Sequence, residues 1–194
     1  MGFCIPISGS RLRYRLVGVE DKGYATLIDT RLHEKSFEVL LSRDLIPWLR
    51  GCRVYKRNAK LYGSIVDYSI LCGDKEAFVE LKSAVMDLGG GVAGYPDAPT
   101  PRGGRQIEAL ANHGKGGGGF SYIVFIAGIP NARGFQLYCN VDRAICRAIR
   151  YATESGVVFK SINVFLNPST KSIVYGDLDL PVDLGCCRAS EPYI

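Results

Sequence analysis

The chain has 194 residues, 47% of them hydrophobic, and carries a formal net charge of +5. This length can bury a full core without a second large domain, and the mild positive charge favours an anionic partner. No apolar run is long enough to span a bilayer, and the first residues, MGFCIP, fit neither a signal peptide nor a myristoylation site. We therefore expect a single cytoplasmic domain, residues 1–194, with an N-terminal hairpin (1–30), a core (31–185) and a C-terminal tail (186–194).

The first half of the chain predicts a hairpin, a helix and further strands. Its β-rich segments, each bounded by turn residues, are 11–19, 24–29, 52–56, 61–71 and 77–86. The first two are joined by the turn sequence EDKG and predict an N-terminal β-hairpin. From Lys35 to Leu49, apolar residues recur mostly at spacings of three and four, which predicts an amphipathic helix with Pro47 near its end.

The second half predicts two more helices on a sheet. Its expected elements are a Gly- and Pro-rich loop over 87–100, a helix over 104–112, an apolar strand over 120–127, a helix over 141–154, and strands over 157–166 and 171–175. Asn140 or Asp142 begins the last helix, and Gly156 lies just past its end. The order of elements indicates the α/β class, a mixed β-sheet flanked by helices.

The cysteines, histidines and glycine run show no catalytic or metal-binding spacing. The seven cysteines include no Cys-x-x-Cys pair, so we interpret them as reduced thiols, with structural disulfides as the alternative for a hyperthermophilic source; Cys186 and Cys187 are assigned no chemistry. His33 and His113 lie near no nucleophile signature and are interpreted as ordinary surface or core residues. The run GKGGGG at 114–119 follows a helix and leads into a strand, unlike a Walker loop, and is interpreted as a flexible connector.

Two acids and a lysine lie on adjacent predicted strands. In the strand AFVELK, side chains alternate between faces, so Glu80 and Lys82 share the face opposite the apolar residues. If the turn at CGDK pairs Leu71 with Glu76, Asp67 falls opposite Glu80, with Cβ atoms about 5 Å apart. Two acids this close repel unless a cation lies between them. The alternative is a half-buried strand with a solvated charged face.

This motif and the loop after it carry a family resemblance. Asp67, the segment Glu80–Ser83 (ELKS) and the segment Tyr95–Gly103 (YPDAPTPRG) resemble the sugar fermentation stimulation protein family, SfsA. In that family an EVKS strand precedes a block that reads roughly FPDAxTxRG. The resemblance covers about residues 26–184 of this chain.

The chain departs from the family pattern in places around the motif. Pro101 stands where the family has an acid, Gln106 where it has a histidine, and Asp29-Thr30 where it has an Asn-Thr pair. Family members usually carry an N-terminal OB-fold, and the roughly thirty residues available here are too few for a complete five-stranded barrel. A dimer partner could supply the missing surface, so a homodimer is one expectation.

The resemblance implies a restriction-endonuclease-like core of the PD-(D/E)xK type. In that fold Asp67 and Glu80 would bind Mg²⁺ or Mn²⁺, and the backbone carbonyl of Leu81 would complete the coordination. Lys82 would orient or help deprotonate the attacking water. Glu38 on the first helix is a further candidate for contact with the metal or water, with a solvated helix charge as its alternative.

The loop before the second helix is expected to bind phosphate. Asp97, Thr100, Arg102 and Arg105 lie where backbone N–H groups and a guanidinium could hold it. A structural salt bridge is the alternative for Arg102, and a turn or helix cap is the alternative for Asp97.

Two functions are compatible with these patterns. The first is a metal-dependent nuclease that hydrolyses phosphodiester bonds of DNA or RNA. The second is a non-catalytic DNA-binding regulatory protein of the same family, which the mild positive charge favours and the intact set of two acids and a lysine disfavours.

Overall fold

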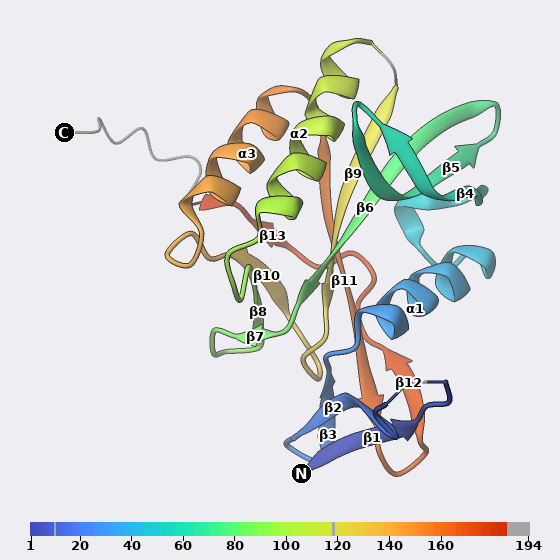
Figure 1. Cartoon of the computed structure of the whole chain (residues 1–194), viewed down its shortest axis with the longest axis vertical. Coiled ribbons are helices and arrows are strands. Elements are labelled where there is room, and N and C mark those ends of the chain that lie inside the picture. Colours follow the sequence, from blue (N-terminus) through green and yellow to red (C-terminus); the bar gives the residue numbers. More distant parts are fainter. Residues whose placement is uncertain (10, 118, 186–194) are drawn as a thin grey trace.

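The computed structural model describes residues 1–9, 11–117 and 119–185, so the expected tail with Cys186 and Cys187 lies outside the described residues. The described helices are α1 (Thr30–Ser42), α2 (Pro101–Lys115) and α3 (Arg143–Glu154), with a 3-10 turn η1 (Pro47–Leu49). The strands are β1 (Gly2–Pro6), β2 (Tyr14–Asp21), β3 (Tyr24–Leu27), β4 (Cys52–Leu61), β5 (Ser64–Cys72), β6 (Lys75–Ala84), β7 (Met86–Asp87), β8 (Val92–Tyr95), β9 (Phe120–Ala127), β10 (Gly134–Leu137), β11 (Val158–Asn167), β12 (Ser172–Tyr175) and β13 (Val182–Asp183). The fold is mixed α/β, as the sequence predicts (Figure 1). None of the helices in these described ranges is long and apolar enough to cross a membrane.

A large curled sheet organises the molecule. Its strands lie in the order β1-β2-β3-β11-β9-β6-β5-β4, with β12 paired to β11, and a small sheet has the order β13-β10-β8-β7. At its centre β6, β9 and β11 run parallel, whereas β4, β5 and β6 form an antiparallel meander. Figure 1 shows α2 and α3 beside each other, with α1 apart from them. Because β4 is the last strand of the sheet and β6 lies next to β9, the meander leads from the edge of the sheet to its centre.

The core consists of two apolar clusters, one on each face of the large sheet. Strand β9 contributes to both, because Ile123 and Phe125 pack with α2 and α3 whereas Val124 and Ile126 pack with α1. All four side chains are fully buried, which confirms the predicted central strand buried on both faces. The two clusters fix the central strands between the helices.

The first helix differs from its prediction at both ends. It begins at Thr30 instead of Lys35, because the Asp29 carboxylate accepts the Leu32 N–H at 2.9 Å and caps a polar first turn. It ends at Ser42 instead of Leu49, since Asp44 adopts a left-handed backbone with φ 56°. Pro47 then opens the separate 3-10 turn. The early start brings the residues of the first turn to the sheet.

Other boundaries also shift. A turn at Tyr62-Gly63 interrupts the start of the segment predicted as strand 61–71, and the strand after it is β5. The short strand expected at 52–56 extends to Leu61 as β4. The loop expected over 87–100 contains β8, and helix α2 begins at Pro101. Asp142, one of two expected caps, accepts N–H bonds at the start of α3. The short strands β1, β10 and β13 were not predicted.

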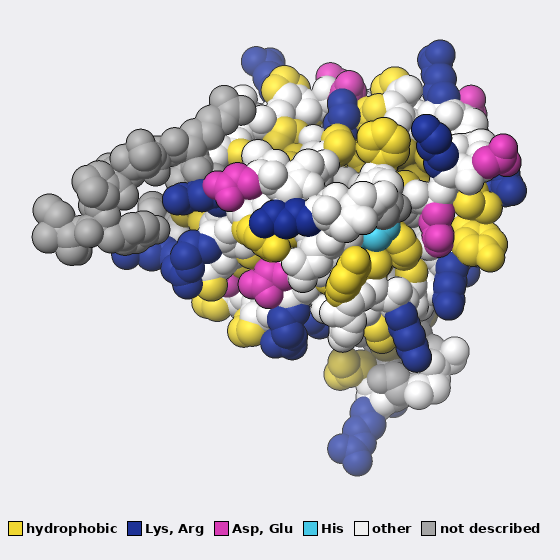
Figure 2. Space-filling view, turned by 90° about the horizontal axis from the view of Figure 1, so that it is seen from above, with side chains coloured by type: hydrophobic (Ala, Val, Ile, Leu, Met, Phe, Trp, Pro, Cys, Tyr) yellow, Lys and Arg dark blue, Asp and Glu magenta, His cyan; other side chains and the backbone are white. Residues whose placement is uncertain are grey.

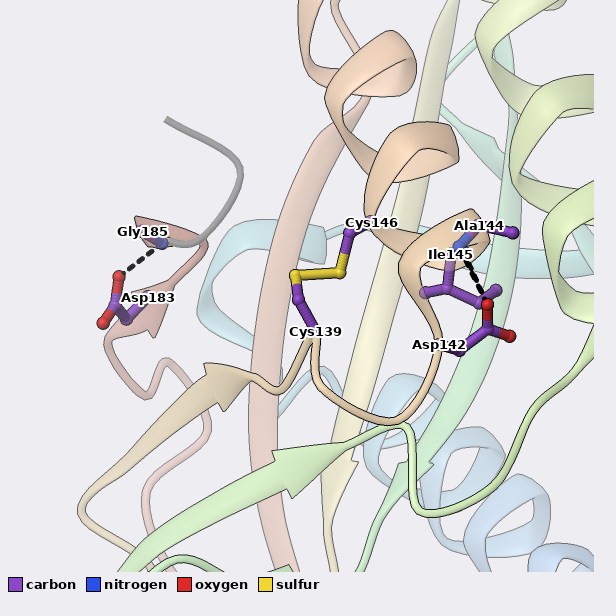
Figure 3. The surroundings of a disulfide bond; sticks show 7 residues. All are labelled: Cys139, Asp142, Ala144, Ile145, Cys146, Asp183 and Gly185. Atoms are coloured by element: carbon purple, nitrogen blue, oxygen red, sulfur yellow. Dashed lines mark hydrogen bonds between the residues drawn. A yellow bond between two sulfur atoms is a disulfide. The ribbon is translucent and has the colours of Figure 1, made fainter. Parts of the chain in front are cut away.

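The interpretation of the cysteines as reduced thiols is wrong for four of them. Disulfides join Cys52 to Cys72 and Cys139 to Cys146, whereas Cys4 keeps an exposed free thiol. The first bond connects the opposed ends of β4 and β5. Figure 3 shows the second, which ties the segment before α3 to its first turn. The alternative of structural disulfides therefore holds for these pairs.

Candidate functional site

Asp67 and Glu80 meet on the β5–β6 hairpin in the predicted register. Leu71 pairs with Glu76, and the backbone pairing continues to Tyr68 and Val79. At the next position side chains take over, because the Asp67 N–H donates to Glu80 Oε2 at 3.2 Å and the Leu81 N–H donates to Asp67 Oδ2 at 2.7 Å. The two carboxylates are therefore held crosswise between the strands.

Lys82 lies beside this acid pair. Its Nζ donates to Glu80 Oε1 at 2.7 Å and to Gln106 Oε1 on α2 at 3.0 Å. The Gln106 side-chain amide in turn donates to the Ile65 carbonyl at 2.9 Å. Glu80 is 3% exposed and Lys82 is 7% exposed, so the charged face of this strand is not solvated. Gln106 fixes the ammonium where it contacts one of the acids.

Burial acts on both acids, and the charge of Asp67 acts on Glu80 in addition. Burial raises the pKa of Glu80 to about 7, and the Asp67 charge acts in the same direction, whereas Lys82 opposes the rise. Burial likewise raises the pKa of Asp67, against the lowering by the Leu81 N–H, Lys82 and Arg102. When both acids are ionised, a single lysine ammonium lies against them, and the pair retains excess negative charge.

The acid pair opens into a cavity of about 420 Å³. The start of α1, the strands β5 and β6, the loop before α2 and the first turns of α2 form its walls. Of the residues expected to bind phosphate, Asp97, Thr100 and Arg102 line it, whereas Arg105 does not. Asp97 and Arg102 are exposed, which leaves a guanidinium free to meet an anion at the cavity mouth.

Thr100 also has a structural role. Its hydroxyl accepts the Gly103 N–H at 3.1 Å, and its own N–H donates to Asp142 Oδ2 at 2.9 Å. The other carboxylate oxygen of Asp142 caps α3, next to the Cys139–Cys146 disulfide (Figure 3). Thr100 thus joins the starts of α2 and α3 and positions the loop that bears Asp97.

The structure does not bring Glu38 to the cavity. Both Glu38 oxygens accept from Arg57 at 2.6 Å, and Oε1 also accepts from the Tyr68 hydroxyl at 3.1 Å. Glu34, one helical turn earlier, lines the cavity instead. Burial raises the pKa of Glu34, and Asp67 adds to that rise. The acid that α1 supplies to the site is therefore Glu34, displaced by four residues from the expected one.

His33 is a buried residue of the cavity wall. The Leu27 carbonyl can only accept, so His33 Nε2 carries a proton and donates to it at 2.9 Å. Nδ1 then accepts from the Ser83 hydroxyl at 2.8 Å, and burial lowers the pKa of His33 to about 4. This neutral imidazole connects α1 to the strand of Glu80. His113 is buried as well and contacts Ser121 at 3.0 Å.

Three contributors to the cavity were not predicted as site residues: Glu34, Gln106 and His33. Glu34 and Glu38 share one face of a helix at a spacing of four, so the sequence signal for an acid was correct but not unique. Gln106 occupies a position at which the chain departs from the family pattern, and this departure was the available signal. In the part of the chain that the structure describes, no group of three or more His, Cys, Asp and Glu side chains forms a metal-ligand set.

The chain is similar to known proteins along most of its length. The family model Sugar fermentation stimulation protein RE domain matches residues 31–170. A sugar fermentation stimulation protein homolog from Pyrococcus furiosus is 38% identical over 182 residues, which cover 94% of this chain and 78% of the homolog. A homolog from Archaeoglobus fulgidus is 38% identical over 168 residues, which cover 86% of this chain and 71% of the homolog.

A solved structure gives the same assignment. The structure of Pyrococcus furiosus SfsA in complex with Ca²⁺ matches with a TM-score of 0.88 and 39% identity, and the match covers 94% of this chain and 77% of that one. The order of strands and helices and the sequence thus point to one family. The chain belongs to the sugar fermentation stimulation protein family, SfsA.

Proposed function

We propose that the protein is a divalent-metal-dependent nuclease with a restriction-endonuclease-like PD-(D/E)xK core. The observation that carries this proposal is the acid pair Asp67 and Glu80, held together with Lys82 at the wall of a cavity that Arg102 also lines. The element order of α1, the meander β4–β5–β6, α2 and β9 agrees with the one expected for such a core. Phosphodiester hydrolysis is a reaction that these groups suit.

The residues fit a hard divalent cation such as Mg²⁺ or Mn²⁺. Mg²⁺ keeps several waters and needs one or two carboxylates, which Asp67 and Glu80 provide without a third acid. The N–H and carbonyl of one strand residue point to the same edge, so the Leu81 carbonyl faces the side on which its N–H meets Asp67. The related Pyrococcus furiosus SfsA was solved with Ca²⁺, another cation that prefers oxygen ligands.

The protein side chains have distinct tasks in this proposal. Asp67 and Glu80 hold the cation, which when bound would neutralise charge on the phosphate and make a bound water more acidic. The Lys82 ammonium, held by Gln106, orients the attacking water and keeps Glu80 in place. Arg102 contacts the phosphate from the cavity mouth. The proposed substrate is DNA or RNA, because these groups would bind and hydrolyse a phosphodiester bond.

Cleavage assays with a matched pair of variants test the proposal. Wild-type protein is incubated with single- and double-stranded DNA and RNA in Mg²⁺ or Mn²⁺, and then with EDTA. We expect metal-dependent cutting that Asp67→Asn abolishes and that Asp74→Asn preserves, since Asp74 is an exposed acid at the turn of the same hairpin. Cutting that persists unchanged in Asp67→Asn would overturn the assignment of the site.

A second candidate function is a nucleic-acid-binding protein that does not cut. The observation that favours it is the engagement of Lys82, whose ammonium already bonds to both Glu80 and Gln106. Tight, salt-sensitive binding without cleavage across all four substrates and both metals selects this function.

A further inference from the structure

Strand β4 is the free edge of the large sheet and has an unusual composition. It pairs with β5 on one side, and its sequence, CRVYKRNAKL, contains four basic residues and no acid. Three of the basic residues and one tyrosine define what we name the β4 surface: Arg53, Tyr55, Lys56 and Lys60. Figure 2 views the molecule from above, and on the face that it shows Lys and Arg side chains are scattered with fewer Asp and Glu among them.

The side chains of the β4 surface are available to a ligand. Arg53, Lys56 and Lys60 are exposed and make no ion pair or side-chain hydrogen bond with another residue of the described ranges. Tyr55 is 64% exposed, so its ring contributes little to the folded core and is open to contact with a ligand. The strand therefore presents uncompensated positive charge and an aromatic ring together.

A hollow of about 280 Å³ separates β4 from α1. Lys35 of α1 lines it together with Arg53 and Arg57 of β4, against the single acid Glu38. Because Glu38 already pairs with Arg57, the positive charge of Lys35 and Arg53 remains unbalanced at the hollow. This charge is complementary to a phosphate chain that passes between the helix and the edge strand.

The β4 surface is connected to the cavity through the sheet. Arg57 of β4 pairs in register with Tyr68 of β5, and Tyr68 directly follows Asp67. On α1, Glu34 lines the cavity, and its neighbour Lys35 lines the hollow. The hollow beside β4 and the cavity are thus lined by neighbouring residues of α1, and Asp67 lies on the strand that pairs with β4.

A simpler explanation of the charges is protection of an exposed sheet edge. Lysine on an edge strand discourages pairing with another chain. That role accounts for Lys56 and Lys60 but does not require an exposed Tyr55 beside them. Basic groups with interleaved aromatic rings are instead typical of surfaces that bind single-stranded nucleic acid.

From these observations the geometry points to a binding site for single-stranded nucleic acid on the β4 surface. Arg53, Lys56 and Lys60 contact its phosphates, and the ring of Tyr55 stacks on a base. The inference rests on the proposed function in one respect: it assumes that the cavity cleaves nucleic acid, and it identifies single-stranded nucleic acid as the form delivered there.

Binding is measured by fluorescence anisotropy on the Asp67→Asn background, with labelled oligo(dT) and oligo(U) and with duplex competitors, at several salt concentrations. Arg53→Gln with Lys56→Gln removes two phosphate contacts, so we expect the slope of log K against log salt to change by about 1.4 and the affinity at 0.1 M salt to fall about 25-fold. The matched control, Arg133→Gln with Arg147→Gln, removes the same charge from exposed positions outside the β4 surface and is expected to bind as the parent does.

A second pair of variants tests the stacking contact. Tyr55→Ala is expected to weaken binding about tenfold, whereas Tyr55→Phe keeps the ring and binds as the parent does. Three outcomes would overturn the inference even if the protein cuts. The β4 and control double variants could weaken binding equally, Tyr55→Ala could bind as tightly as the parent, or the duplex competitor could be preferred. Loss of binding specific to β4 in a protein that never cuts would support it and reject the nuclease proposal alone.

Discussion

Two acid-containing regions lie side by side in this protein and differ in how their charge is balanced. Beside α1, Glu38 accepts two bonds from Arg57, whose side chain is 64% exposed, so one acid meets one base at the surface. In the cavity, the buried ammonium of Lys82 contacts Glu80 and attracts Asp67 without a direct bond, so two acids face one buried lysine. Excess buried charge costs stability, and proteins retain such an arrangement where a ligand compensates it. The comparison separates a structural ion pair from a candidate cation site.

The largest difference between the regions is expected in catalysis. Glu80→Gln removes a proposed cation ligand, and we expect cleavage to fall about 1,000-fold, equivalent to about 4 kcal/mol in the barrier. Glu38→Gln makes the same chemical change outside the cavity and is expected to leave the rate nearly unchanged. Initial rates at saturating Mg²⁺ measure both. Equal losses in the two variants would show that Glu38 belongs to the working site.

Removing the basic partner of each region, Lys82 in the cavity and Arg57 beside α1, should change the stability of the protein by different amounts. Lys82→Met removes the ammonium that contacts the buried Glu80 and attracts the half-buried Asp67, so the metal-free protein should lose about 3 kcal/mol in its free energy of unfolding. Arg57→Met should have little effect, because solvent already screens that exposed group. Urea unfolding with and without Mg²⁺ measures these changes, and Mg²⁺ should restore much of the loss in Lys82→Met. A larger loss in Arg57→Met would reverse the comparison.

The pH dependence of stability sharpens the contrast in the metal-free protein. The pKa of Glu80 is about 7 in the fold, above its ordinary value of 4.5, so the folded state holds this proton more tightly. Its stabilising contribution is complete below pH 4.5 and is lost as the pH rises through 7, a change of about 3 kcal/mol. The free energy of unfolding of wild type minus that of Glu80→Gln should therefore decrease over this range.

The same difference cancels His33, which acts in the opposite sense. Its pKa of about 4 lies below the ordinary 6.5, so its contribution is present above pH 6.5 and is lost as the pH falls through 4. Saturating Mg²⁺ should flatten the wild-type curve, because a bound cation keeps Glu80 ionised. A difference curve that stays flat without metal would contradict the assigned shift.

The smallest effect is expected for the groups that position the two charges. Gln106→Leu removes the bonds to Lys82 and to the Ile65 carbonyl, and should cost about 1 kcal/mol of stability and slow cleavage about fivefold. Tyr68→Phe removes the hydroxyl that bonds to Glu38 and should leave cleavage unchanged. If Gln106→Leu lowers kcat and leaves KM unchanged, Gln106 acts by positioning Lys82. A loss of stability with kcat unchanged would indicate loss of packing alone.

Local signals explain which parts were predictable from the sequence. The strand Phe120–Ala127 was predicted with correct bounds because an apolar run buried on both faces needs no partner to be recognised. The pairing of Leu71 with Glu76 was predicted from the turn sequence, and this register places Asp67 against Glu80. Both results depend on neighbours in the chain.

The missed features depend on residues distant in sequence. Strands β10 and β13 pair with each other in a second sheet, and each is too short to show a period of its own. Gln106 reaches Lys82 across 24 positions and His33 reaches Ser83 across 50, so no local pattern indicates either contact. The exchange of Glu38 for Glu34 has the same origin, because only the docking of α1 decides which turn faces the cavity.

The Cys52–Cys72 disulfide makes the β4–β5 hairpin a closed ring. The bond joins the first residue of β4 to the last of β5, while the turn at Tyr62-Gly63 joins the opposite ends. A protease that cuts the exposed turn would therefore nick the chain without releasing either strand. Asp67 and the β4 surface would stay attached to each other through sulfur, so the nick would leave the proposed site in one covalent unit.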